Sequence, residues 1–206
     1  MKRVIACGLL LFALAAPALA ENSPEDLLRR LMQTAAQGDV RGFLSNLSNA
    51  SQREFANLQT AKTEFSRAQQ SFAAALDQRF GGGHQPVRIV GDQDLTSVIT
   101  RLRDIELLST RPLGPNKIQL RVRTLSKGFK GREVAEEDTF TTVREQGRWK
   151  LELANLAQGA RQITTAQTAA FNAVIQQVRA GVYKDDISAM IAAANARRNV
   201  LQGAHG

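Results

Sequence analysis

The sequence predicts an α+β fold, with helices before and after an antiparallel sheet. Apolar residues recur at steps of three and four up to Phe80 and again after Thr164, which is the period of an amphipathic helix. Between Ile105 and Leu153, apolar and polar residues alternate as they do in a strand with one buried face. Helices segregated to one side of such a sheet make the α+β class.

The composition is that of an ordinary globular protein. The chain has 206 residues, of which 43% are hydrophobic, and this is enough apolar side chain for a core. The length suits one domain, or one domain with an appendage. The 27 basic and 19 acidic residues give a net charge of +8. A single cysteine, Cys7, excludes a disulfide framework.

Residues 1–20 have the pattern of a secretory signal peptide. Lys2 and Arg3 precede an apolar run at residues 4–16, and small residues precede a cleavage point after Ala20. The run is shorter than the roughly 20 residues that a bilayer span needs. Its removal would take away the cysteine and two basic residues, leaving 186 residues with a net charge of +6. We therefore expect a periplasmic or secreted protein with no transmembrane segment in its mature chain.

Capping signals place two helices after this leader. Ser23 as N-cap and Pro24 in the first turn are predicted to open a helix that ends at Gly38. Asp39 is predicted to cap a short second helix.

A long third helix is predicted to carry a stripe of phenylalanines. Residues 51–54, Ser-Gln-Arg-Glu, have the form of a capping box that would open it, and the three glycines at 81–83 would end it. The stripe comprises Phe55, Leu58, Ala61, Phe65, Ala68, Phe72, Leu76 and Phe80.

The middle of the chain is predicted to be mainly strands. Residues 87–90 suit a short strand, and residues 94–102 a helix capped by Asp94. Residues 105–110 are extended and residues 112–116 form a turn. Three more strands are predicted at 118–123, 134–145 and 149–153, with a loop at 127–132 and a hairpin turn at 146–147.

After Thr164 the helical period returns, and it continues after Gly181. The predicted divisions of the chain are a signal peptide at 1–20, an α+β domain at 21–156, a C-terminal helical extension at 157–200 and a flexible tail at 201–206.

The segment Ala36-Gln37-Gly38-Asp39 before a short helix, and the closing hairpin at residues 140–151, resemble the NTF2-like (SnoaL-like, cystatin-like roll) superfamily. The resemblance covers about residues 24–154. It implies an NTF2-like cone, in which the N-terminal helices pack into a curved antiparallel sheet, and a homodimer through the open face of that sheet.

Residues 158–165 followed by Phe171 resemble the corresponding region of periplasmic phospholipid carriers of the MlaC type. This resemblance implies a lipid as the bound partner. The helix predicted at 94–102 departs from the carrier pattern.

The phenylalanine stripe suggests a pocket for a lipid or other small hydrophobic ligand. If a curved sheet covers the stripe and small side chains leave space, an apolar cavity follows. The alternative is a solid core, which is the usual place of buried aromatic residues. The candidate lining residues are Phe55, Phe65, Phe72, Ile99, Leu120, Val122, Phe140 and Trp149.

A basic segment between the strands suggests an anion patch. Its candidate residues are Arg121, Arg123, Lys127, Lys130 and Arg132. The alternative is a solvated face in which the acids at 133–138 pair these bases across the strands. Nucleic acid is not an expected partner, because the patch has no interleaved aromatic residues.

Catalytic candidates are few, so the chain is expected not to be an enzyme. Tyr183 is the only tyrosine, His84 follows the glycines, His205 is in the tail, and Asp92 and Asp94 suit turn and cap positions. The two histidines lie more than a hundred residues apart, so no metal site is predicted. The sequence has no phosphate-binding loop and no dinucleotide-binding motif, so no cofactor is predicted.

Three functions remain open from the sequence. The first is an exported, non-enzymatic binding or interaction module that holds a small hydrophobic ligand or none. The second is a periplasmic lipid carrier, and the third is a small enzyme acting on a hydrophobic substrate.

Overall fold

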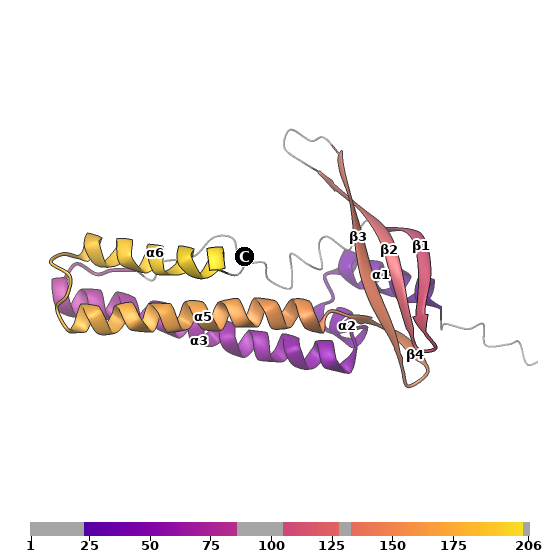
Figure 1. Cartoon of the computed structure of the whole chain (residues 1–206), viewed down its shortest axis with the longest axis horizontal. Helices are drawn as coiled ribbons and strands as arrows, with labels where there is room; N and C mark the ends of the chain where they lie inside the picture. Colours follow the sequence, from indigo (N-terminus) through magenta and orange to yellow (C-terminus); the bar gives the residue numbers. More distant parts are fainter. Residues whose placement is uncertain (1–22, 86–104, 128–132, 204–206) are drawn as a thin grey trace, which may run out of the picture.

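A computed structural model of the chain describes residues 23–85, 105–127 and 133–203. The expected signal peptide, the strand at 87–90, the helix at 94–102 and most of the loop at 127–132 lie outside these residues. The described part has an α+β fold with five helices and one four-stranded antiparallel sheet, so the predicted fold class is confirmed at this level (Figure 1).

The elements follow in the order helices, sheet, helices. They are α1 (Pro24–Gln37), α2 (Val40–Ser45), α3 (Asn49–Phe80), β1 (Ile105–Gly114), β2 (Lys117–Lys127), β3 (Glu133–Glu145), β4 (Arg148–Glu152), α5 (Ala154–Arg179) and α6 (Asp186–Gly203).

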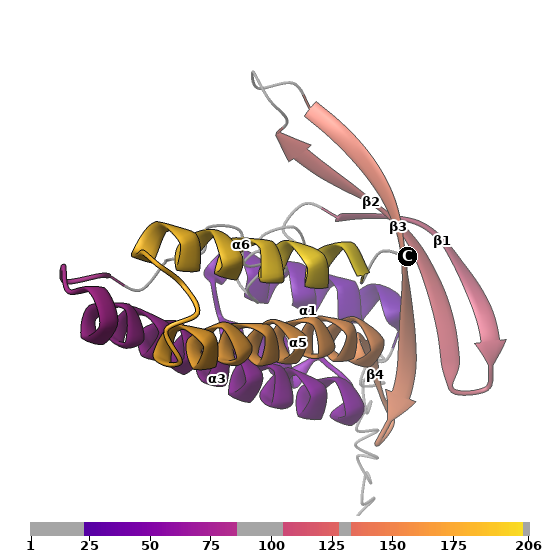
Figure 2. The same ribbon diagram turned by 60° about the vertical axis from the view of Figure 1, so that its left-hand side comes forward.

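The molecule has two regions that share helix α3. The head consists of α1, α2, the sheet and the first turns of α3 and α5, and the arm consists of the rest of α3 and α5 together with α6. Figure 1 shows the arm extending away from the sheet, and the turned view of Figure 2 shows α6 lying along α5. No helix among the described residues is long and apolar enough to cross a bilayer.

The predicted start and end of the first helix and the predicted start of the second are confirmed. The Ser23 hydroxyl accepts a hydrogen bond from the Asp26 backbone N–H, and Gly38 ends α1 in the left-handed region with φ 65°. The Asp39 carboxylate accepts from the Gly42 N–H and caps α2. These caps satisfy backbone donors that an α-helix leaves unpaired at its start.

The predicted start of the long helix is wrong by one turn. Helix α3 begins at Asn49 with Ser48 as its N-cap, and Ser51 lies inside the helix. The Ser48 hydroxyl takes the capping hydrogen bond from the Ser51 N–H, which leaves the Ser51 hydroxyl free to bond across to β4. The predicted end is confirmed, since Gly81 follows the last helical residue, Phe80.

The sheet is an antiparallel meander in the order β1-β2-β3-β4. The predicted alternation in β2 is confirmed, because Leu120 and Val122 are fully buried while Arg121 on the opposite face is exposed. The predicted hairpin turn is also confirmed. Gln146 and Gly147 have φ values of 50° and 79°, which suit a two-residue turn between twisted strands.

One core fills the space between α1, α2 and the sheet. Its fully buried side chains come from α1, from the α2 region and from the strands β2 and β4. They include Leu27, Leu31, Phe43, Leu47, Leu120, Val122 and Leu151, all 0% exposed. Helix α1 therefore covers the apolar face of the sheet.

The predicted start of the C-terminal helices is wrong. Helix α5 begins at Ala154, directly after β4, and not near Thr164. Gly159 stands in the interior of this helix, with open space around the position of its missing Cβ. Helix α6 extends to Gly203, so it includes the first residues of the expected tail.

A second core fills the arm, and it corrects the expected position of the phenylalanine stripe. Phe65, Phe72 and Leu76 of α3 pack against Phe171 and Val178 of α5 and not against the sheet. The ring of Phe171 meets the rings of Phe65 and Phe72 edge-on, with centroids 5.4 and 5.8 Å apart. The physical reason is the length of α3, which carries most of the stripe past the edge of the sheet.

Candidate functional site

The structure does not bring the eight candidate pocket residues together. Five of them belong to the head core or pack against it: Phe55, Leu120, Val122, Phe140 and Trp149. Phe65 and Phe72 belong to the arm core, and Ile99 lies outside the described residues.

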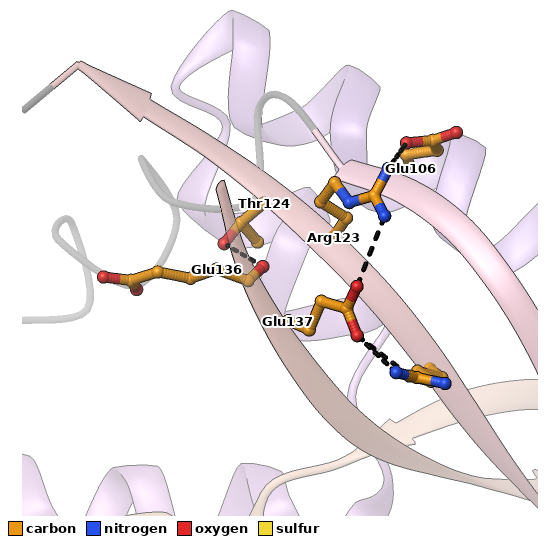
Figure 3. A network of polar contacts seen from close by, with 6 residues as sticks. Glu106, Arg123, Thr124, Glu136 and Glu137 are labelled. Atoms are coloured by element: carbon orange, nitrogen blue, oxygen red, sulfur yellow. Dashed lines mark hydrogen bonds and ion pairs between the residues drawn. The ribbon is translucent and has the colours of Figure 1, made fainter. Parts of the chain in front are cut away.

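The described residues of the candidate anion patch are paired. Arg121 and Arg123 both contact the Glu137 carboxylate, at 2.5 and 3.3 Å, and Arg123 also contacts Glu106 at 3.2 Å (Figure 3). Hydrogen bonds from both arginines lower the pKa of Glu137, and the larger contribution comes from Arg121. These two arginines therefore form cross-strand ion pairs, the arrangement expected as the alternative to an anion patch. Lys130 and Arg132, and the side chain of Lys127, lie outside what the structure describes.

Of the catalytic candidates, His84 is the one that the structure places between two carboxylates. Its Nδ1 lies 2.7 Å from an Asp77 carboxylate oxygen and its Nε2 lies 3.0 Å from an Asp186 oxygen. The hydrogen bond to Asp186 raises the pKa of His84 most, and the hydrogen bond to Asp77 raises it further. Hydrogen bonds from His84 lower the pKa of both aspartates. The imidazolium joins the end of α3 to the start of α6 at the tip of the arm.

The other candidates form no such group among the described residues. The Tyr183 hydroxyl donates to the side chain of Gln177, while Asp92, Asp94 and His205 lie outside the described ranges. No group of three or more His, Cys, Asp or Glu side chains within those ranges is arranged to hold a metal ion.

A buried polar cluster joins α3, β4 and α5. The hydroxyls of Ser48 and Ser51, both 0% exposed, donate to the two oxygens of Glu152 at 2.8 and 3.0 Å. Ser51 Oγ also accepts from the Leu153 N–H at 2.7 Å, and the carboxylate accepts from the Ala154 N–H at 2.9 Å. Both hydroxyls are therefore used in fixing the junction of three elements. The cluster has no signature in the sequence, because Glu152 lies more than a hundred residues from the serines.

Two hollows open on the surface of the head. One, of about 300 Å³, lies where β3 and β4 meet the start of α5, and is lined by Phe140, Glu152, Leu153 and Leu156 among others. The other, of about 390 Å³, lies between α1, α2 and β4. We call the second hollow the basic cleft.

The basic cleft gathers three cations from two elements. Arg30 comes from α1, and Arg148 and Lys150 come from the edge strand β4. The neutral amides Gln33, Gln37 and Asn46 line the same space. None of the described residues that line it is acidic.

Local packing fixes two of these cations. Arg30 Nε donates to the Asn46 side-chain oxygen at 3.2 Å, and the Asn46 amide donates to the Gly42 carbonyl at 2.9 Å. Lys150 Nζ donates to the Ser45 carbonyl at the end of α2. Burial, together with the positive charges of Arg148 and Arg30, lowers the pKa of Lys150. The positive charges of Arg148 and Arg30 thus act on the Lys150 ammonium.

Gly42 permits the close approach of α1 and α2 beside the cleft. A Cβ at this position would stand 2.9 Å from Thr34 Cγ2 and 2.2 Å from the capping Asp39 oxygen. The cleft was not predicted from the sequence, because its cations are separated by more than a hundred residues. The parallel bridge between Leu47 and Leu151, which brings the α2 region to β4, has no sequence signature either.

Comparisons with protein-family models, with curated proteins and with solved structures found no match for this chain. The function is therefore argued from the geometry and charge of the residues described above.

Proposed function

We propose that the protein is an exported, non-enzymatic binding module that recognises its ligand on the surface of the head. The observation that carries this proposal is how completely the apolar side chains fill the two cores. Leu27, Leu31 and Phe43 occupy the space under the sheet at 0% exposure. In the arm, the Phe65 and Phe171 rings are in direct edge contact. The two hollows at the surface of the head are the places where a ligand has room.

The arm then serves as a rigid spacer or a second contact surface. Helices α3 and α5 pack along each other through large apolar side chains, and such interiors are close-packed and resist deformation. An extended arm of this kind can hold the head at a distance from whatever its tip contacts.

Kinship with the NTF2-like superfamily belongs to this proposal. Its support is a head in which N-terminal helices cover one face of an antiparallel meander. The long α3–α5 arm is the feature that the resemblance does not account for.

The lipid carrier is the weaker alternative. It needs an apolar chamber for acyl chains, whereas the candidate lining residues divide between two filled cores. The third candidate, a small enzyme acting on a hydrophobic substrate, has still less support. Both ring nitrogens of His84 are already bonded to carboxylates, so the ring has no free nitrogen to act as a base.

Native mass spectrometry of protein exported and purified without detergent tests the proposal. We expect a polypeptide that begins at Glu21, with no bound phospholipid, and the same spectrum reports whether it is a homodimer. Co-purifying phospholipid together with lipid transfer between vesicles would favour the carrier instead. Turnover of a substrate that is lost in Asp94→Asn or His84→Ala would establish the enzyme.

A further inference from the structure

One side of helix α6 stays exposed in the part of the chain that the structure describes. The helix lies along α5 in Figure 2, and its buried residues, Ala189 and Ala193, belong to the arm core. On the other side, Ile187 is 61% exposed and Ile191 is 56% exposed. Val182, shortly before the helix, is 64% exposed. Large apolar side chains gathered at the surface in this way mark a contact with another molecule.

The composition of α6 also points to a second contact. No residue from Ile187 to Ala196 carries a charge, and the polar side chains in this run are those of Ser188 and Asn195. A helix at the protein surface ordinarily carries charged and polar residues opposite its buried stripe, whereas a helix that is apolar all round is ordinarily covered all round. We therefore expect the exposed side of α6 to be covered as well as the side that packs on α5.

The exposed side chains of α6 form a stripe that complements a copy of itself. The stripe consists of Ile187, Ile191, Ala194 and Arg198, all exposed and separated by four, three and four residues, so they share one face of the helix. The spacing is the same from either end, so an antiparallel copy can pair with it about a two-fold axis. Ile191 then faces Ala194 of the other copy, and a large side chain against a small one lets two helices approach closely.

The charges at the two ends of α6 favour the antiparallel arrangement. The charged side chains at its start, with their immediate contacts, are those of Asp77, His84, Lys184, Asp185 and Asp186. Even with the imidazolium charged, acids are in excess there. Toward the other end, α6 carries Arg197 and Arg198 and no acid after its first residue. An antiparallel pair brings the acidic end of each helix to the basic end of the other, whereas a parallel pair brings like charges together.

We propose that the exposed side of α6 binds α6 of a second copy of this chain, antiparallel and about a two-fold axis. A lipid surface fits less well, because helices that lie on membranes carry basic residues along their polar face, and α6 has no charge from Ile187 to Ala196. The inference rests on the proposed role of the arm as a contact surface, and it names the partner. Since α6 runs from the tip of the arm back toward the head (Figure 1), the pairing places the two heads at opposite ends of the dimer.

Sedimentation equilibrium of the mature chain over a range of concentrations tests the proposal. We expect a monomer that converts to a dimer as the concentration rises. Ile191→Glu should weaken the dimer about tenfold or more, because it places a charge in an apolar contact. Leu156→Glu is the matched control, since Leu156 is 55% exposed but lies at the start of α5, beside the sheet. It should change the dissociation constant by less than about twofold.

Disulfide cross-linking tests the direction of the pair without weakening the fold. The single cysteine of the sequence, Cys7, lies in the expected signal peptide, so an introduced cysteine is the only one in the mature chain. Ile191→Cys lies near the proposed axis and should form a disulfide-linked dimer under mild oxidation. Ile187→Cys should not, because the antiparallel pairing separates its two copies by about 16 Å along the helices, beyond the reach of a disulfide. A parallel pair would link through both.

Four results would overturn the inference. A monomer at every concentration would leave the exposed side of α6 to another part of the chain or to a different protein. A dimer that Leu156→Glu dissociates and Ile191→Glu does not would place the contact at the sheet. A disulfide through Ile187→Cys would make the pair parallel, and sedimentation with phosphatidylcholine vesicles that Ile191→Glu abolishes would assign a membrane surface. The lipid content and turnover measurements decide the proposed function separately.

Discussion

The head and the arm are built on the same helix, α3, but they are held together in different ways. In the arm, side chains at helical spacing on α3 meet side chains at helical spacing on α5, and large rings do most of the filling. In the head, residues from four or more elements converge, and buried polar groups such as the Ser48–Ser51–Glu152 cluster fix the junctions. The comparison teaches that the periodic region supplies stiffness, while the irregular region supplies surface hollows.

The largest effect is expected in the arm. Phe72 is 2% exposed and contacts Phe171, so Phe72→Ala should cost about 3–5 kcal/mol in the free energy of unfolding. Urea unfolding followed by circular dichroism measures it. Trp149, the single tryptophan, lies in the head core and reports that region by fluorescence. A loss below about 1 kcal/mol would place the Phe72 ring at the surface.

The next effect is expected at the junction in the head. Ser51→Ala leaves the buried Leu153 N–H without its protein partner and removes one of the hydrogen bonds to Glu152, which should cost about 1–3 kcal/mol. Thr63→Ala is the matched control on the same helix, because its exposed hydroxyl bonds only within α3. Equal losses in the two variants would show that the cluster contributes nothing to joining the elements.

Replacing two glycines by alanine should change the free energy of unfolding in opposite directions. In the head, Gly42→Ala forces the Asp39 carboxylate away from the Gly42 N–H and should cost about 1 kcal/mol, the usual value of a lost N-cap. Gly159→Ala in α5 meets open space and should stabilise the protein by about 0.5–1 kcal/mol. Thermal unfolding measures both, and a stabilised Gly42→Ala would contradict the close approach of α1 and α2.

The smallest effect is a pH dependence at the tip of the arm. The raised pKa of His84 means that the charged ring stabilises the fold fully below its ordinary value of 6.5, and that this contribution is lost as pH rises through the higher folded value. The lowered pKa values of Asp77 and Asp186 add stability above 3.8 that is lost in acid. Stability should therefore be largest between these limits.

His84→Gln should flatten the alkaline side of this profile. Hydrogen exchange at the start of α6 measures the effect where it occurs, at pH 5.5 and at pH 8.5. Equal protection of wild-type α6 at the two pH values would contradict the role of the imidazolium in holding α6.

The sequence predicted the elements whose signals are local. Ser23, Asp39 and Gly81 mark helix ends through their own backbone chemistry, and Gln146-Gly147 marks a turn for the same reason. The start of α3 was misplaced because both Ser48 and Ser51 can cap, and a distant carboxylate, Glu152, decides between them.

The sequence could not predict what covers the phenylalanine stripe, because periodicity shows which face is apolar and not which element packs on it. The sheet and α5 were equally compatible with the spacing of Phe65 and Phe72. The basic cleft was missed for a related reason, since Arg30 and Lys150 become neighbours only through the pairing of Leu47 with Leu151.

A double-mutant cycle on the unfolding free energy tests the central claim, that the stripe is covered by α5 and not by the sheet. The cycle pairs Phe65→Leu with Phe171→Leu, and a second cycle pairs Phe65→Leu with Leu120→Val. We predict a coupling of about 0.5–1.5 kcal/mol in the first cycle, as for an edge-on aromatic pair, and additivity in the second. Additivity with Phe171 and coupling with Leu120 would contradict the claim.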